Sequence, residues 1–225
     1  MCRGKSICTE LGELPEHWPK DKCIELPKEA FEAVEEFKKA VNHFVEGNRE
    51  LTITHINNIC NEKLTYWFIE HGQMSGRHRK IITKLNRQPS IPIEHRDPVR
   101  SPSKLQNQVF ERDNYTCRYC GIQLVSQDFL KKFMKCLDYN QFQKGRTNIE
   151  QHAIVHFMWP VADHVVPWNL GGFTCLDNLV TACATCNYGK DGYTLEELQI
   201  TNPLLRQPIK SDWKGFVDKI DLLNT

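Results

Sequence analysis

A long apolar run is absent from the sequence, and this absence excludes two classes of protein. The first residues, Met1 to Lys5, do not begin the apolar segment of a signal peptide. No stretch approaches the roughly 20 apolar residues that a membrane-spanning helix needs. We therefore expect a cytoplasmic protein that binds no membrane and keeps its thiols reduced.

Net charge is nearly absent as well. It is +1 at pH 7 over 225 residues, so no overall basic field attracts nucleic acid. Basic residues nevertheless gather in the segment 77–104, where eight lysines and arginines stand against two acids, a local charge of +6. Such a segment suits an arm that follows a phosphate backbone, and a solvated linker is the alternative. Its basic residues are Arg77, Arg79, Lys80, Lys84, Arg87, Arg96, Arg100 and Lys104.

Regular cysteine spacing is missing outside two pairs. Of the ten cysteines, four form Cys117-Arg-Tyr-Cys120 and Cys183-Ala-Thr-Cys186. Two residues between ligands let one tight turn direct both sulfurs to a tetrahedral ion, so we predict a structural zinc site that joins two distant segments. Core cysteines or redox pairs are the alternatives, although the βαβ pattern that accompanies redox pairs is absent. The candidates for a second metal site, at unequal spacing, are Cys2, Cys8, Cys23 and His17.

Polar residues suited to hydrolysis lie between and just after the cysteine pairs. They are Asp163-His164, Asn178-Leu179 and Asn187. Together with the cysteines they resemble the HNH endonuclease family, in the subclass whose ββα-metal motif is held by zinc, over about Pro102 to Leu198. The last histidine of the family name is Asn187 in this chain. The corresponding segments are 103–120 for the first helix and zinc knuckle, 162–167 and 177–180 for the strands, Gly171-Gly172 for the loop, and 183–190 for the helix.

The resemblance implies a role for each polar residue. His164 acts as general base, because an imidazole with a pKa of about 6.5 is mostly unprotonated at pH 7. Asp163, on the opposite side of the strand, ligates a divalent ion such as Mg²⁺ or Mn²⁺, and Asn187 supplies a second oxygen. Asn178 holds the loop and orients the histidine ring through its amide.

Other side chains have open roles. Asp191 follows Asn187 by one helical turn and is either a further metal ligand or the residue that ends the helix. Lys190 either contacts a phosphate or is solvated. The predicted nucleic-acid-binding residues are Lys190, Arg118, Arg96, Arg100 and Lys104.

The hydrophobic pattern predicts an α+β chain with an N-terminal helical region at 1–88. Apolar residues recur every three or four positions over 27–46, about 54–72 and around 79–85, which indicates three helices. A helix-turn-helix reader of the major groove is one interpretation, but no glycine marks its turn and we favour a packed bundle. A proline-rich basic linker follows at 89–102.

The nuclease domain is predicted at 103–200, with an insertion at about 124–157. Within it, 128–137 is predicted as a helix and 153–161 as the run into the first strand. After the motif, Thr194-Leu195-Glu196-Glu197 is a capping box that starts a short helix, and a C-terminal helix is expected at 201–225. The insertion's basic side is made of Lys131, Lys132, Lys135, Lys144 and Arg146, and the C-terminal apolar stripe of Trp213, Phe216, Val217 and Ile220.

The sequence therefore predicts a metal-dependent endonuclease that hydrolyses DNA, with Zn²⁺ for structure and Mg²⁺ or Mn²⁺ for chemistry. Two alternatives stay open: a zinc-organised nucleic-acid-binding module without catalysis, and a defence or toxin-type nuclease that acts with a partner. Cutting both strands needs two sites and this chain offers one, so a homodimer is the assembly to test.

Overall fold

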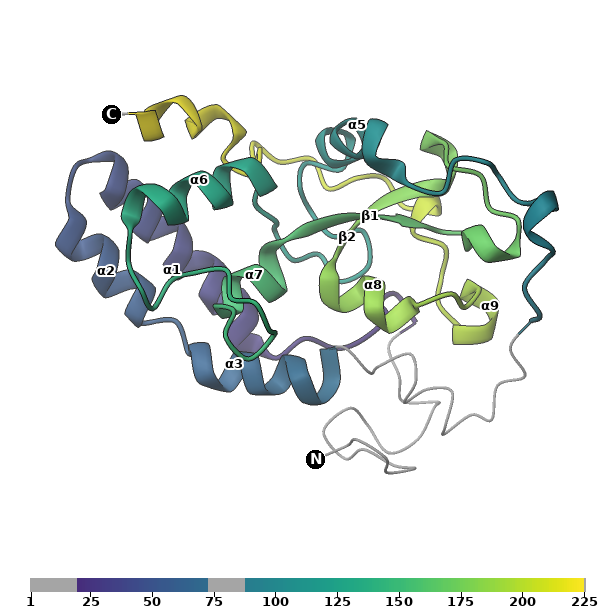
Figure 1. The fold of residues 1–225 in the computed structure, drawn as a ribbon, viewed down its shortest axis with the longest axis horizontal. Coiled ribbons are helices and arrows are strands. Elements are labelled where there is room, and N and C mark those ends of the chain that lie inside the picture. The colour runs from purple at the N-terminus through teal and green to yellow at the C-terminus, as the bar shows by residue number, and fades with distance from the viewer. Residues whose placement is uncertain (1–19, 73–87, 225) are drawn as a thin grey trace.

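The computed structural model describes residues 20–72 and 88–224. Three helices open the described chain: α1 (Lys28–Val45), α2 (Arg49–Asn57) and α3 (Asn61–Trp67), followed by a π-helical turn at Phe68–Gly72. Figure 1 shows α1 and α2 side by side at one end of the molecule. The helix expected around 79–85 lies outside the described residues.

Local signals explain where these helices begin and end. The buried stripe of α1 includes Val34, Phe37 and Val41, at the spacing of one helical face. The Asn48 side chain accepts a hydrogen bond from the Leu51 amide and so caps α2. The second helical tract therefore begins earlier than expected and is interrupted before Asn61.

A two-stranded antiparallel sheet lies at the centre of the rest of the chain. It pairs β1 (Pro160–His164) with β2 (Leu179–Cys183), with His164 opposite Leu179. The surrounding helices are α5 (Gln106–Arg112), α6 (Gln127–Leu137), α7 (Ala153–Met158), α8 (Ala184–Lys190) and α9 (Leu195–Leu198). The mixed helical and strand content confirms the predicted α+β class.

One hydrophobic core joins the N-terminal helices to the insertion at 124–157. Phe37 of α1 lies edge-on to Phe133 of α6, with ring centroids 5.5 Å apart, and also contacts Phe142 and Phe216. All four rings are buried. The insertion therefore anchors the N-terminal helices beside the sheet, as the arrangement of α1, α6 and α7 in Figure 1 shows.

The predictions for two segments were wrong. Most of the segment 153–161, predicted as the run into the first strand, forms the helix α7 at Ala153–Met158. The segment 201–224 contains only short 3-10 turns, at Pro203–Leu205, Val217–Lys219 and Asp221–Asn224, in place of a continuous C-terminal helix.

Backbone constraints explain the broken C-terminal segment. Gly215 and Phe216 both have positive φ, at 61° and 62°, and a helix cannot pass through such residues. A Cβ on Gly215 would lie 2.6 Å from the Tyr115 ring, so this position requires glycine. Three of the four residues of the predicted apolar stripe still pack, because Phe216 is buried and Trp213 and Ile220 are partly buried against the core, whereas Val217 is exposed.

A buried carboxylate fixes the helix before the first cysteine pair to the sheet. Asp113 is fully buried and accepts hydrogen bonds from Arg112, Arg118 and the Thr181 amide at 2.8–2.9 Å. Because Thr181 belongs to β2, this network links the end of α5 to the sheet.

Within the described ranges, no helix combines the length and the apolar character needed to cross a membrane.

Candidate active site

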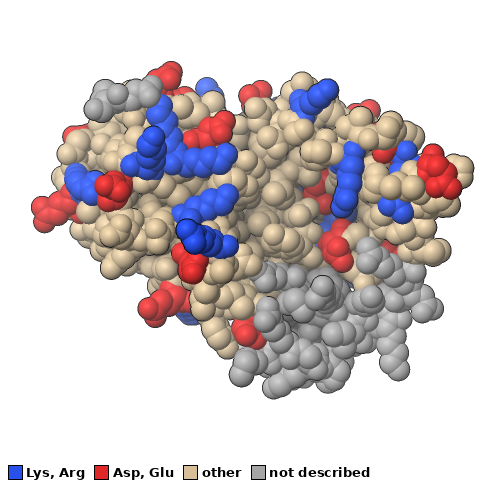
Figure 2. All heavy atoms as spheres, in the orientation of Figure 1, with Lys and Arg blue, Asp and Glu red and all other residues tan. Residues whose placement is uncertain are grey.

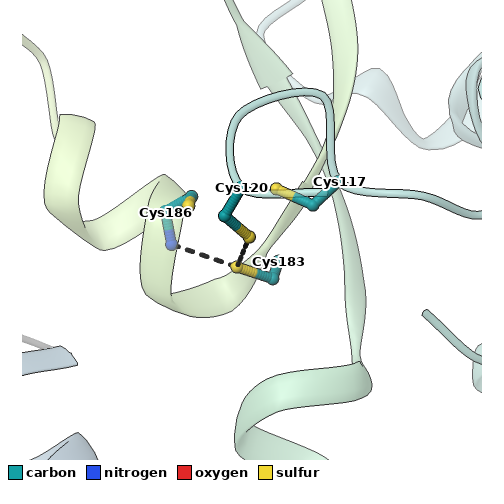
Figure 3. A group of neighbouring side chains, drawn as sticks. All are labelled: Cys117, Cys120, Cys183 and Cys186. Atoms are coloured by element: carbon teal, nitrogen blue, oxygen red, sulfur yellow. Dashed lines mark hydrogen bonds between the residues drawn. The ribbon is translucent and has the colours of Figure 1, made fainter. Parts of the chain in front are cut away.

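The four paired cysteines meet between the start of α8 and the loop that carries Cys117 and Cys120, which we call the knuckle loop. Their sulfur atoms all lie within 4.8 Å of one another. Figure 3 shows Cys117 and Cys120 on one loop, next to Cys183 at the end of β2 and Cys186 in α8, with the Cys120 side chain pointing toward Cys183. The Cys120 and Cys183 sulfurs are 3.8 Å apart, which is about the edge length of a tetrahedron with zinc–sulfur bonds of ~2.3 Å. The cluster could therefore hold a metal ion such as zinc.

The pKa values of the four thiols show how a bound cation would affect their ionisation. Burial opposes ionisation of Cys117, but hydrogen bonds from Cys120, Cys183 and Cys186 outweigh it and lower the pKa of this thiol. The pKa values of the other three thiols are raised, since burial and the neighbouring sulfurs disfavour further negative charge. A bound cation would reverse this effect, because a coordinated thiol is deprotonated. The Cys186 amide donates to the Cys183 sulfur at 3.3 Å, which further stabilises a thiolate there.

Cys23 is a fifth cysteine at this cluster. It is buried, and its thiol is close enough to Cys186 to help raise the pKa of that thiol. Cys23 thus adjoins the predicted zinc site, whereas Cys2, Cys8 and His17 lie outside the described residues.

His164 ends β1 and is half-buried beside the loop that leads to β2. Its Nε2 atom lies 2.9 Å from the Thr174 hydroxyl oxygen. Burial lowers the pKa of the imidazole, against the opposing charge of Asp163. The ring is therefore mainly neutral at pH 7, which is the form that can accept a proton.

Asp163 faces the opposite side of β1, toward α8. Its Oδ2 atom accepts a hydrogen bond from the Tyr119 hydroxyl at 2.7 Å and lies 3.4 Å from the Lys190 ammonium. Burial raises the pKa of this carboxyl, while Lys190 and Tyr119 oppose the rise. The other oxygen, Oδ1, has no hydrogen-bond partner within the described chain and remains available to a ligand.

Asn178 ties the loop between the strands together. Its side chain accepts from the Val166 amide at 2.8 Å and donates to the carbonyls of Val166 and Phe173 at 3.0 and 2.9 Å. A Cβ on Gly172 would lie 1.9 Å from the Val166 carbonyl oxygen, so the loop requires glycine there. The loop-holding role predicted for Asn178 agrees with these contacts, but the imidazole is contacted by Thr174 instead.

Asn187 lies in α8, the helix toward which Asp163 points. It is half-buried, and its side chain makes no hydrogen bond in the described part of the chain. Asp191 has a φ of 52° and ends α8, as the helix-ending alternative predicts.

Residues 159–191 match a protein-family model, HNH endonuclease. This segment is similar to the HNH endonuclease family, and we call the predicted domain at 103–200 that includes it the HNH domain. The matched segment begins just before β1 and ends just after α8, so it holds His164, Asp163 and Asn187 together with the second cysteine pair. No curated protein and no solved structure matches the chain significantly. The HNH family implies a nuclease that acts on nucleic acid.

The predicted linker is fixed to the HNH domain as a strap, which we define as residues 88–101. The Ile91 amide donates to the Asn169 carbonyl at 3.0 Å, and Trp168 Nε1 donates to the Asp97 carbonyl at 2.8 Å. The Asp97 carboxylate accepts from the Thr174 amide at 2.6 Å. The strap therefore forms part of the wall around His164.

Two of the predicted nucleic-acid contacts in the HNH region were wrong. Lys190 is 1% exposed, and its ammonium donates to the His164 carbonyl at 2.6 Å. Arg118 is buried and binds Asp113 and the Pro203 carbonyl. Both cations hold the domain together, because their charges are satisfied inside it.

The three predicted contacts in and after the strap lie at or near the surface. The guanidinium groups of Arg96 and Arg100 lie 4.9 and 5.1 Å from the centre of the Trp168 ring. Such cation–π contacts hold the two charges next to the loop of the HNH domain. Lys104 is exposed in the short turn Pro102–Lys104.

Sequence reasoning missed Thr174, Asp97 and Tyr119 as members of the site, and it assigned Cys23 to a separate candidate metal site. The spacing of Thr174 after His164 carries no recognisable signal, because the loop between them is irregular. Tyr119 lies between the two cysteines of the first pair, and an aromatic residue at that position is more often assigned to the hydrophobic core.

Proposed function

We propose that this chain is a metal-dependent endonuclease that hydrolyses DNA phosphodiester bonds, with His164 as general base. The observation that carries the proposal is the match of residues 159–191 to the HNH endonuclease model. In this segment a neutral, half-buried His164 ends β1, and the oxygen ligands Asp163 and Asn187 lie on the opposite side of that strand. A nuclease needs these two functions next to each other: a base for water and a cation for phosphate charge.

We assign zinc to the four-cysteine cluster. Four thiolates with near-tetrahedral spacing are the ligands of structural zinc, and a closed set of four leaves no position for substrate. The ion joins the knuckle loop to α8, so it fixes the helix that carries Asn187.

Asp163 and Asn187 would hold a catalytic Mg²⁺ or Mn²⁺, since carboxylate and amide oxygens suit these ions. When bound, such an ion stabilises the negative charge that develops on the phosphate and the leaving oxygen. Oδ1 of Asp163 and the side chain of Asn187 are both without hydrogen bonds in the described residues, as ligand atoms should be.

In the proposed step, His164 accepts a proton from water while the water oxygen attacks phosphorus. The bond from phosphorus to the leaving 3′ oxygen breaks, that oxygen takes up a proton from solvent water, and the His164 imidazolium later returns its proton to solvent. The products carry a 5′-phosphate and a 3′-hydroxyl. Lys190 holds the carbonyl of His164 in place, and Asn178 fixes the loop that follows.

At two places a pair of basic side chains lies against a tryptophan ring, and each place could contact a nucleic-acid backbone. Arg96 and Arg100 lie at Trp168, after β1, while Lys131 and Lys144 lie 5.5 and 4.5 Å from the ring of Trp159, just before β1. Figure 2 shows several basic side chains on the α6 side of the molecule, with acidic side chains among them. Phosphate contacts of this kind supply affinity without reading base sequence.

The Lys190–Asp163 pair favours a second candidate, a nucleic-acid-binding module without catalysis. The buried ammonium already neutralises the carboxylate that the catalytic ion would use. The discriminating experiment incubates the zinc-loaded protein with supercoiled plasmid DNA and with RNA, in Mg²⁺, in Mn²⁺ and in EDTA at a concentration that leaves zinc bound. Divalent-ion-dependent nicking of DNA supports the nuclease. DNA binding with no cleavage of either substrate in any ion supports the binding module.

A further inference from the structure

Thr174 holds a hydrogen-bonding position that decides which nitrogen of His164 is free. Its hydroxyl donates to the backbone carbonyl of Val99 in the strap. A carbonyl oxygen can only accept, so the single hydroxyl proton of Thr174 is committed to Val99. The same hydroxyl oxygen faces Nε2 of His164 at 2.9 Å. That oxygen must therefore accept, and Nε2 must carry a proton.

The opposite arrangement is disfavoured. If Nε2 were unprotonated, the Thr174 hydroxyl would have to donate to it. The Val99 carbonyl would then face the hydroxyl oxygen with no proton between them, and two acceptors repel each other. One tautomer of His164 satisfies all three groups.

We propose that Thr174 is a positioning residue that holds His164 in the tautomer with Nε2 protonated, so that Nδ1 is the atom that accepts the proton from water. The inference rests on the proposed function for the use of that atom, but the tautomer itself is a property of the resting protein. The chain of hydrogen bonds is His164 Nε2–H to Thr174 Oγ1, and Thr174 O–H to the Val99 carbonyl.

The strap holds Thr174 in turn. Asp97 accepts from the Thr174 amide at 2.6 Å and from the Val99 amide at 2.8 Å. Thr174, which sets the tautomer, and Val99, whose carbonyl orients it, thus both donate their backbone amides to one carboxylate. After proton transfer the same geometry remains suitable, because the imidazolium keeps its Nε2–H donor to Thr174.

The test compares Thr174→Val, which keeps the shape and removes the hydroxyl, with Thr174→Ser, which restores it. Long-range ¹⁵N–¹H NMR of histidine-labelled protein above neutral pH distinguishes the two tautomers, and the His164 signal is assigned by its loss in His164→Gln. The expected result is a protonated Nε2 in the wild type and in Thr174→Ser, and a mixed or inverted tautomer in Thr174→Val. A wild-type His164 with Nδ1 protonated, or an unchanged tautomer in folded Thr174→Val, overturns the inference.

Kinetics supply the second measurement. Removing a partner that orients a histidine typically costs about 10- to 100-fold, so Thr174→Val should lower the single-turnover cleavage rate by this factor with unchanged DNA affinity, and Thr174→Ser should recover most of it. Equal rates in Thr174→Val and the wild type contradict the inference while leaving the nuclease intact. A wild type that does not cleave refutes the proposed function alone, since the tautomer is still measured by NMR.

Discussion

Acid should destabilise this fold well before its carboxylates are protonated, through the buried His152. This residue is 3% exposed, and burial, aided by the charge of nearby His156, lowers the pKa of His152 to about 3 from an unfolded value of 6.5. Its Nδ1 atom accepts a hydrogen bond from the Ile154 amide at 3.3 Å and caps α7. Protonation would remove that acceptor and bury a charge beside Phe142, whose ring lies edge-on at 4.8 Å.

The sign and size of this change in the free energy of unfolding follow from proton linkage. The folded pKa is below the unfolded one, so the unfolded chain binds the proton first and stability falls as the pH drops below about 6.5. At pH 5 the unfolded His152 is almost fully protonated and the folded one is not. Each pH unit in this window is worth about 1.4 kcal/mol per proton, so lowering the pH from 7 to 5 should remove ~2 kcal/mol through His152 alone. His156, whose pKa is also lowered by burial, adds to the same loss.

The assay is urea unfolding at several pH values between 5 and 7. His152→Asn keeps a capping oxygen for α7 but does not titrate in this range, so its stability should depend less on pH by that ~2 kcal/mol. Ile154→Val, on the same helix, is the matched control: it should cost about 1 kcal/mol at every pH and leave the slope unchanged. Equal slopes in His152→Asn and the wild type would refute a buried neutral His152.

Three further predictions concern the metal cluster, the Asp113 network and the strap. Cys183→Ser should abolish stoichiometric zinc, measured by elemental analysis, and lower the thermal midpoint sharply, whereas Cys175→Ser, an exposed cysteine outside the cluster, should retain the metal. Asp113→Ala should lower the free energy of unfolding by roughly 3–5 kcal/mol, because it leaves buried arginine charge unpaired; a loss below about 1 kcal/mol in urea unfolding contradicts this network. Arg100→Gln should weaken DNA binding and reduce the slope of log affinity against log salt by about 1 in a fluorescence anisotropy titration, and an unchanged slope would mean that Arg100 contacts no phosphate.

Local chemistry made several elements predictable. The apolar stripe of α1, the helix α6 and the capping box at Thr194 all depend on residues that are close in sequence. The capping box, for example, forms as expected, with Thr194 bonded to the Glu197 amide and Glu197 bonded back. The cysteine spacing likewise predicted the four-sulfur cluster, since each pair brings two ligands together by a single turn.

The burial of two basic residues and the attachment of the strap depend on long-range packing, which the sequence did not reveal. Lys190 and Arg118 carry the charges of surface residues, and only the folded chain shows that the His164 carbonyl and Asp113 bind them inside. The strap resembles a free linker because of its prolines, yet Asp97 and Ile91 bond to the loop of the HNH domain. Lys190 and His164 are 26 residues apart, and Asp97 and Thr174 are 77 apart, so no local pattern could indicate these pairs. Arg118 and Asp113 are only five residues apart, but their burial depends on the sheet and on Pro203, which are distant in sequence.

The central claim is that the HNH domain cleaves DNA with His164 as its base. The most direct test is the single-turnover rate of supercoiled plasmid cleavage in Mg²⁺ or Mn²⁺, for the wild type and for His164→Ala with matched zinc content and DNA affinity. A placed general base contributes about 10² to 10⁴ in rate, so the account predicts a loss of that size in His164→Ala. A variant that cleaves as fast as the wild type would contradict it.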